Sequence, residues 1–176
     1  MVIKRVLILR ITSDFKIRNS KDKGPIFVVG CPRSGTSLFK SILNAHSHLV
    51  AGTEFKLLPN IIKVYKKILN LDKVREGFYL KNNDVNKIFR DFILSFFEKF
   101  IEKSNNKRLV EKTPQNIVII EELAEILPEA KFLHIVRDGR NVVNSLIKRD
   151  WVNINTGQKV WYIKNKKMQQ NTGLVW

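Results

Sequence analysis

The chain has 176 residues, of which 44% are hydrophobic and 27% are charged, and it carries 32 Lys and Arg residues against 16 Asp and Glu residues. This composition excludes a disordered chain, and no apolar run approaches the roughly 18 residues that a membrane span requires. We expect one soluble globular domain. The net charge of +16 favours an anionic partner and leaves nucleic acid, anionic lipid and small phosphorylated or sulfated ligands open.

Residues 1–24 form a basic N-terminal segment, and residues 25–176 are expected to form the domain. The segment contains a short apolar run, Val6 to Ile11, that is broken by Arg10 and lacks a small-residue cleavage site, so it is a poor secretory signal. We interpret the segment either as a loosely ordered basic arm or as an added edge strand.

A strand, a glycine-containing loop and a helix follow in that order. The run IFVVG, Ile26 to Gly30, is short, apolar and rich in β-branched residues, which is typical of a buried parallel strand. The loop GCPRSGTS, Gly30 to Ser37, leads into a segment with apolar residues at helical spacing, Thr36 to His46. This is the setting in which phosphate-binding loops occur.

The loop departs from the usual phosphate-binding pattern G-x-x-x-x-G-K-[ST] at one position, because Thr36 instead of Lys follows Gly35. A loop that leads into a helix still presents free backbone amides and the positive end of the helix dipole, which together bind a phosphate or a sulfate. Arg33, Thr36 and Ser37 can add side-chain donors. The alternative is a tight turn between strand and helix that binds no ligand.

Two amphipathic helices are predicted next, over Lys56 to Asn70 and over Asp84 to Lys103. The second carries a continuous apolar stripe, which we interpret as core packing and not as a ligand site. The residues of this stripe are Val85, Ile88, Phe89, Phe92, Ile93, Phe96, Phe97, Phe100 and Ile101.

The remaining elements alternate between strand and helix. We predict a short strand from Arg108 to Lys112, a helix from Asn116 to Leu127, a strand from Lys131 to Val136 and a helix from Asp138 to Asp150. Strands that alternate with helices predict an α/β sandwich built on a central parallel sheet with right-handed connections. In such sheets ligands lie beyond the carboxyl ends of the strands.

A second anion-binding element is predicted in VRDGRNVVNSLIKRD, Val136 to Asp150. Arg137 stands at the end of the predicted strand, and Ser145 and Arg149 share one face of the following helix. Two guanidinium groups and a hydroxyl make a suitable clamp for a phosphate. In the alternative interpretation, an Arg of a solvated helix pairs with a nearby carboxylate such as Asp138.

Two further charged residues are candidates for chemistry. Glu54, in VAGTEFKLLP, lies just after the first predicted helix, and Lys112, in EKTP, ends a predicted strand. Near an anion site a carboxylate can act as a general base, and a Lys can stabilise a leaving group. Single Glu and Lys residues are usually solvated, which is the alternative for each of them.

Cys31 is the only cysteine, so the chain cannot form an internal disulfide, and a reducing cytoplasmic location is predicted. We interpret Cys31 itself as a small packed side chain. His46, His48 and His134 have no metal-ligand spacing with a cysteine, and no metal site is predicted. We expect capping, surface or core roles for these histidines.

From Ile26 to about Trp151 these elements together resemble the sulfotransferase family, and especially its tyrosylprotein sulfotransferase-like and prokaryotic branches. The stretch PRSGTS looks like the family's 5′-phosphosulfate loop, and VRDGRNVVNSLIKR looks like its 3′-phosphate motif. The resemblance implies a P-loop NTPase-like three-layer α/β sandwich. It also implies 3′-phosphoadenosine 5′-phosphosulfate (PAPS) as the sulfuryl donor, adenosine 3′,5′-bisphosphate (PAP) as the product and no metal.

The resemblance assigns roles to matching positions. Arg33 would lie near the bridging oxygen of the donor, Glu54 matches the general base of the tyrosylprotein branch, and Lys112 matches a lysine that stabilises the transition state. These three are the catalytic candidates. The residues that would bind the donor are Arg33, Ser34, Gly35, Thr36 and Ser37 on its 5′ side and Arg137, Ser145 and Arg149 on its 3′-phosphate.

The resemblance implies an acceptor hydroxyl, carried by a small molecule, a glycan, a lipid or a peptide tyrosine. The tyrosylprotein pattern has an acidic pair where this chain has Thr53 and Glu54, so the sequence does not choose among these four acceptors. No nucleic-acid partner is expected, and a homodimer is compatible with the sequence.

Three other functions stay open on the sequence. One is a P-loop nucleotide kinase or NTPase, which the missing Lys after Gly35 disfavours. Another is a basic nucleic-acid-binding protein, which the net charge permits although no recognised binding motif is present. The third is a truncated, inactive paralogue that still binds the donor. We expect the C-terminal portion of the domain to be missing, because the chain ends at NTGLVW, where members of the family continue.

Overall fold

The computed structural model describes residues 6–8 and 24–147. The chain divides into two compact units, Met1–Val136 and Arg137–Trp176, and each is described by itself. None of the helices in the described part of the chain is both long and apolar enough to span a bilayer.

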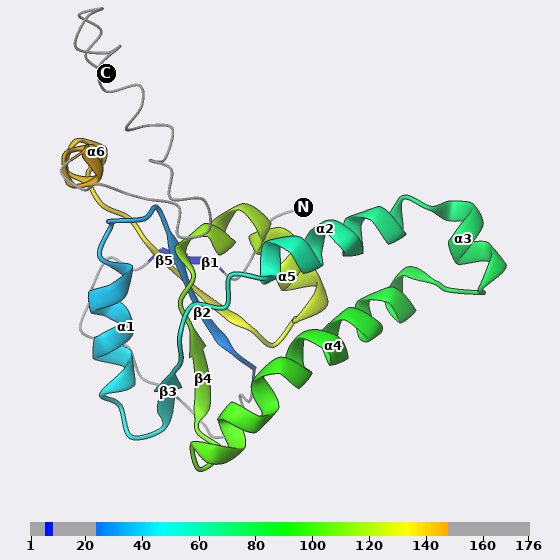
Figure 1. The fold of residues 1–176 in the computed structure, drawn as a ribbon, viewed down its shortest axis with the longest axis horizontal. Coiled ribbons are helices and arrows are strands. Elements are labelled where there is room, and N and C mark those ends of the chain that lie inside the picture. Colours follow the sequence, from blue (N-terminus) through cyan, green and yellow to red (C-terminus); the bar gives the residue numbers. More distant parts are fainter. Residues whose placement is uncertain (1–5, 9–23, 148–176) are drawn as a thin grey trace, which may run out of the picture. The chain divides into compact units, whose positions relative to one another are not determined.

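The first unit is built around a sheet of five strands, in which all neighbouring strands are parallel (Figure 1). Their order across the sheet is β1-β5-β2-β4-β3. The strands are β1 (Val6–Ile8), β2 (Ile26–Gly30), β3 (Leu49–Ala51), β4 (Arg108–Glu111) and β5 (Lys131–Ile135). The predicted strands are confirmed as β2, β4 and β5, and the latter two end one residue earlier than expected.

The two edge strands, β1 and β3, lie in segments whose sequence has no clear pattern. Strand β1 pairs with β5 at the edge of the sheet, so the edge-strand alternative for the N-terminal segment is confirmed over residues 6–8. Strand β3 at the opposite edge was not predicted, because its three residues are too few to show a pattern.

The predicted helices appear in the predicted order with differences at their ends, and one further short helix, Asp72–Gly77, was not predicted. The described residues form α1 (Thr36–Asn44), α2 (Leu58–Leu69), α3 (Asp72–Gly77), α4 (Asn82–Lys103), the 3-10 helix η1 (Pro114–Ile119), α5 (Ile120–Ile126) and α6 (Gly139–Ile147). The helix predicted from Asn116 to Leu127 is wrong in its first part, which belongs to η1, and there the buried side chain of Asn116 donates a hydrogen bond to Glu111. Residues 148–150 of the last predicted helix lie outside the described residues.

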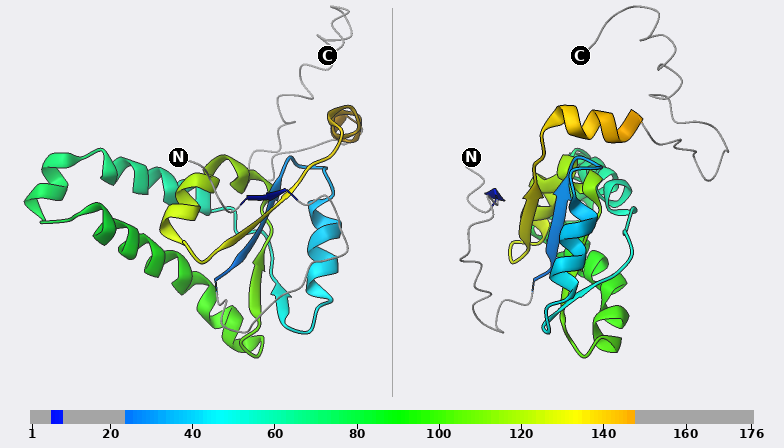
Figure 2. Two further views of the ribbon diagram at one scale, coloured as in Figure 1. Left: turned by 180° about the vertical axis from the view of Figure 1, so that it is seen from behind. Right: turned by 90° about the vertical axis from the view of Figure 1, so that its left-hand side faces the viewer.

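Helices cover both faces of the sheet in the first unit (Figures 1 and 2). On one face Leu43 of α1 packs in an apolar cluster with Ile26 and Val28 of β2. On the other face the alternate residues Phe27 and Val29 join a larger cluster formed with α2, α4 and α5. Because successive side chains of a strand point to opposite faces, β2 is buried on both sides. The predicted three-layer α/β sandwich is therefore confirmed.

Helix α4 carries the predicted apolar stripe, but only one of the two rows in it belongs to the core. The buried row is Val85, Phe89, Ile93 and Phe97. The second row, which remains substantially exposed, is Ile88, Phe92, Phe96 and Phe100. Ile101, the last residue of the stripe, is partly buried and packs against the same core. The stripe is wider than the face that α4 packs against its neighbours, so the prediction of core packing is confirmed for the first row and Ile101 but not for the second row.

These two rows offer a matched test of how much the core side of α4 stabilises the fold. Ile93 is 0% exposed and Ile88 is 52% exposed on the same helix. We expect Ile93→Ala to lower the free energy of unfolding by about 2–5 kcal/mol, because it leaves a cavity in the core. Ile88→Ala is expected to change it by about 0.5 kcal/mol or less. Urea unfolding of both variants checks the difference, and equal losses would contradict the assignment of the two rows.

Candidate active site

The loop between β2 and α1 has a backbone that depends on glycine. Gly30 has a φ of 147°, and a Cβ atom at this position would lie 2.5 Å from the carbonyl oxygen of Ile135. Gly35, the N-cap of α1, has a φ of 105°, and Arg33 adopts a φ of 74°. Positive φ values in a short loop help to turn successive N–H groups to one side, which makes a concavity that binds anions.

The side chains of this loop also favour the binding of an anion. Ser34 and Thr36 are buried, and the hydroxyl of Ser34, which is 7% exposed, has no hydrogen-bond partner among the described residues. Helix α1 has neither a side-chain cap nor an acidic residue in its first turn. A buried hydroxyl without a partner costs about 1–3 kcal/mol. The loop therefore has the donors that an anionic ligand would satisfy.

Cys31 corrects one expectation from the sequence. Its side chain is exposed and not packed. The carbonyl oxygen of Cys31 accepts a 3.1 Å hydrogen bond from the N–H of Ser34. This turn uses the backbone of Cys31 and leaves its side chain at the surface of the loop.

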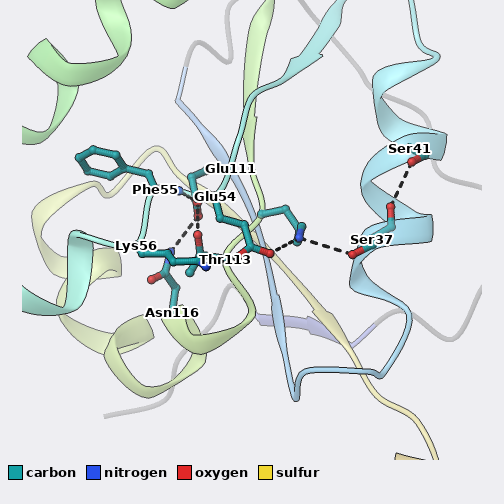
Figure 3. A network of polar contacts seen from close by, with 9 residues as sticks. Ser37, Ser41, Glu54, Phe55, Lys56, Glu111, Thr113 and Asn116 are labelled. Carbon is teal, nitrogen blue, oxygen red and sulfur yellow. Dashed lines mark hydrogen bonds and ion pairs between the residues drawn. The ribbon is translucent and has the colours of Figure 1, made fainter. Parts of the chain in front are cut away.

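The sheet order brings the other catalytic candidates to this loop. Strand β4 lies between β2 and β3, so the residues that follow these three strands meet at one edge of the sheet. Lys112 directly follows β4, and Glu54 lies in the connection from β3 to α2. Nζ of Lys112 forms an ion pair with Oε1 of Glu54 and a 3.5 Å hydrogen bond with Oγ of Ser37 in α1 (Figure 3). Three segments that are distant in sequence thus form one cluster.

The electrostatics of this cluster favour an ionised Glu54. Burial raises the pKa of Glu54, but the hydrogen bond and charge of Lys112, assisted by Lys56 at 3.5 Å, outweigh that effect and hold the pKa below its ordinary value. Lys112 is only 8% exposed. A carboxylate that is ionised at neutral pH can accept a proton, and a nearby buried ammonium group can stabilise developing negative charge.

Glu111 is a charged residue of this site that the sequence analysis did not identify. It is the last residue of β4, and it is buried with 2% of its surface exposed. Its carboxylate accepts hydrogen bonds from the N–H of Phe55, the hydroxyl of Thr113 and the amide of Asn116 (Figure 3). The available signal was a Glu at the end of an otherwise apolar strand with two polar residues shortly after it.

The predicted 3′-phosphate element belongs to the second unit. Arg137 is exposed and Ser145 is partly buried on α6, whereas Arg149 lies outside the described residues. The carboxylate of Asp138 is bound by Arg140, with an Nη2–Oδ2 distance of 2.8 Å, and this hydrogen bond lowers the pKa of Asp138. The convergence of Arg137, Ser145 and Arg149 on one phosphate stays a prediction.

The histidines are placed at ordinary positions. His46 and His48 are exposed, and Nδ1 of His46 accepts a 3.2 Å hydrogen bond from the N–H of His48. Over the described ranges, 6–8 and 24–147, no group of three His, Cys, Asp or Glu residues is arranged to hold a metal ion.

Comparison with known proteins gives consistent relatives. A family model described as "Sulfotransferase family" matches residues 25–172. A "Protein-tyrosine sulfotransferase" of Drosophila melanogaster is 35% identical over 127 residues, which are 70% of this chain and 25% of that protein. The "Protein-tyrosine sulfotransferase 1" of Danio rerio is 36% identical over 135 residues, which are 74% of this chain and 37% of that protein.

Among solved structures, the "Sulfotransferase Domain from the Curacin Biosynthetic Pathway" aligns with a TM-score of 0.48 and 21% identity, and the alignment covers 86% of this chain and 54% of that domain. The chain spans 25% and 37% of the lengths of the two curated relatives named above.

Proposed function

This chain belongs to the sulfotransferase family, and we propose that it transfers a sulfuryl group from PAPS to an acceptor hydroxyl. The observation that carries the proposal is the cluster of Ser37, Glu54 and Lys112, in which Lys112 joins the loop side of the site to a carboxylate. The loop offers donors for an anion, and the carboxylate offers an acceptor for a proton.

The residues of the loop fit the phosphosulfate end of the donor. The hydroxyl of Ser34 is buried without a partner among the described residues, and the first turn of α1 carries no acidic side chain that would compete. We propose that the 5′ side is bound by Arg33, Ser34, Gly35, Thr36 and Ser37. We propose that the 3′-phosphate is bound by Arg137, Ser145 and Arg149.

The chemistry can be assigned to residues of the chain. When bound, the donor supplies an activated sulfuryl group and a phosphate leaving group. Glu54 would accept the proton of the acceptor hydroxyl as its oxygen attacks sulfur, because its pKa is lowered and it is ionised at neutral pH. Lys112 and Arg33 would balance the charge that develops on the leaving oxygen. Their positive charges serve the purpose that Mg²⁺ serves in kinases.

The acceptor is proposed as a hydroxyl. We place a peptide tyrosine first, because the curated relatives are named protein-tyrosine sulfotransferases. Hydroxyls of small molecules, glycans and lipids come next, since Thr53 replaces an acidic residue of the tyrosylprotein pattern. A homodimer and a cytoplasmic location remain predictions.

The alternatives are less well supported. Family membership disfavours both a nucleotide kinase or NTPase and a nucleic-acid-binding protein. An inactive paralogue that still binds the donor differs from an active enzyme only in turnover, so an assay with labelled donor separates the two.

The first test is thermal unfolding of the full chain with PAP, ATP and AMP at matched ionic strength. PAP at 100 times its dissociation constant should stabilise the chain by about 2.7 kcal/mol, which corresponds to a shift in Tm of roughly 5–10 °C for a domain of this size. The shift should be confined to PAP and lost in Arg137→Ala. An equal response to all three nucleotides would indicate binding through bulk charge and would contradict the proposed donor site.

A further inference from the structure

The buried carboxylate of Glu111 is connected to the segment that carries Glu54. Oε1 of Glu111 accepts a 3.1 Å hydrogen bond from the N–H of Phe55, which is the residue directly after Glu54. The same oxygen accepts a 2.5 Å hydrogen bond from the hydroxyl of Thr113, and Oε2 accepts a 2.8 Å hydrogen bond from Nδ2 of Asn116. The carboxylate therefore joins the end of β4, helix η1 and the connection from β3 to α2.

Glu111 is also connected to Lys112 through the backbone. Glu111 is the last residue of β4 and Lys112 follows it directly, and the two side chains have different partners: Glu111 contacts Phe55, Thr113 and Asn116, whereas Lys112 contacts Glu54 and Ser37. One buried side chain thus holds the backbone on both sides of the ion pair between Glu54 and Lys112. Figure 3 shows Glu111 with its hydrogen bonds to Phe55 and Thr113.

Burying a carboxylate is unfavourable, so a buried position is expected to carry one only where the hydrogen bonds that it accepts are needed. Burial raises the pKa of Glu111 above its ordinary value, although the hydrogen bonds from Thr113, Phe55 and Asn116 act in the opposite direction. An apolar side chain would fill the same space without this cost. It would leave the N–H of Phe55 without this acceptor and the segment around Glu54 without its attachment to β4.

We propose that Glu111 is a positioning residue, whose carboxylate holds the Glu54 segment against β4 so that Glu54 and Lys112 keep their ion pair. The importance of Glu111 for catalysis rests on the proposed function, because Glu54 is the proposed base. The ion pair itself is a property of the folded chain and can be measured without donor or acceptor.

The experiment compares Glu111→Ala with Glu111→Gln. Glu111→Ala removes all three hydrogen bonds, so Glu54 should separate from Lys112 and its pKa should rise. Glu111→Gln keeps one carbonyl oxygen for Phe55 and Thr113, and its amide can donate to Asn116 once that side chain rotates by about 180°. Oδ1 of Asn116 is buried and has no partner within the described residues, so it is available for this bond. The pKa of Glu54 should therefore stay lowered in Glu111→Gln.

The pKa of Glu54 is measured by carbon NMR of the full chain labelled at the glutamate side-chain carboxyl, with the signal assigned by its loss in Glu54→Gln. Glu129→Ala is the matched control, because it removes another carboxylate with a charged partner, Arg90, just before β5 at the amino end of the strands. Whatever its effect on Tm, this control should leave the titration of Glu54 unchanged. A higher pKa of Glu54 in Glu111→Ala alone supports the proposal.

Two results would overturn it. One is an unchanged titration of Glu54 in a Glu111→Ala variant that still unfolds cooperatively, and the other is an equal rise in Glu111→Ala and Glu111→Gln. If Glu111→Ala does not fold, Thr113→Val removes one donor from Glu111, and the pKa of Glu54 should rise by a smaller amount; no rise there would also count against the proposal. Failure of PAP binding would contradict the proposed function and leave this titration unaffected.

A turnover measurement extends the same comparison once an acceptor is found. Misplacement of a reacting group by about 1 Å can lower turnover on the order of 10²-fold. Glu111→Ala should lower kcat to that extent with an unchanged dissociation constant for PAP, and Glu111→Gln should restore kcat. A loss of PAP affinity in step with kcat would indicate a general structural defect instead.

Discussion

Replacing Glu54 by Gln is expected to lower the turnover of sulfuryl transfer by about 10²–10⁴-fold, because the amide cannot accept the proton of the acceptor hydroxyl. The side chain keeps its shape, and its carbonyl oxygen can still accept a hydrogen bond from Lys112. Affinity for PAP should therefore change little. Turnover is measured with labelled PAPS at saturation, using the acceptor that a screen of tyrosine peptides, phenols, glycans and lipids identifies.

The control for this prediction is Glu76→Gln, which removes one carboxylate from an exposed position of α3. It makes the same change in net charge far from the loop in sequence and should leave turnover unaffected. Nearly normal turnover of Glu54→Gln at saturating donor would show that Glu54 is not the base. The cluster with Lys112 would then be a structural ion pair only.

Replacing Lys112 by Met is expected to lower turnover by about 10²–10³-fold, because the variant lacks the ammonium group that would balance the charge on the leaving oxygen. Met keeps most of the length of the side chain. The substitution should also raise the pKa of Glu54, which Lys112 now holds down. The acidic limb of the pH–rate profile should consequently move to higher pH in this variant. Rates measured as a function of pH check both effects, and Lys103→Met at the exposed end of α4 is the matched control.

The same ion pair has a consequence for stability. Because the pKa of Glu54 is lowered in the folded chain, its contribution to stability is present above the pKa of an unfolded Glu and is lost as the pH falls through the lowered value. Lys112→Met should weaken this dependence of stability on pH.

In a double-mutant cycle, the effects of Glu54→Gln and Lys112→Met on turnover should not be additive, since the two side chains act as a unit. Additive losses would contradict their cooperation in one step.

Much of the fold could be predicted because its central parts have strong local patterns. The run from Ile26 to Gly30 is apolar at every position, and it forms the strand that is buried on both faces. The apolar spacing in α2 and α4 likewise predicted helices of nearly the observed length. The start of the segment at Asn116 was not predicted correctly, because the apolar spacing does not reveal that the side chain of Asn116 is buried and hydrogen-bonded to Glu111 at the end of β4.

The site was predicted less completely, for a physical reason. Glu54 and Lys112 were identified through their surroundings in the sequence, but their ion pair depends on the order of β2, β4 and β3 in the sheet. Glu111 was missed because a Glu in RLVEK looks like a solvated residue until its partner at Phe55, 56 positions away, is known. Cys31 was placed wrongly because helix and strand patterns do not determine which side chains of a loop face solvent.

The strand order also determines when the anion-binding loop can take shape during synthesis. Strand β2 leads into this loop, and both of its neighbours, β4 and β5, come much later in the chain, with Ile26 pairing with Val110 and Lys131. At a synthesis rate of about 5–20 residues per second, β2 waits roughly 5–20 s for its last partner. Gly30 makes its close approach to β5 only then. The loop is thus synthesised early but reaches its final conformation late. During that interval β2 is an unpaired apolar strand, and the yield of folded chain depends on its protection from aggregation.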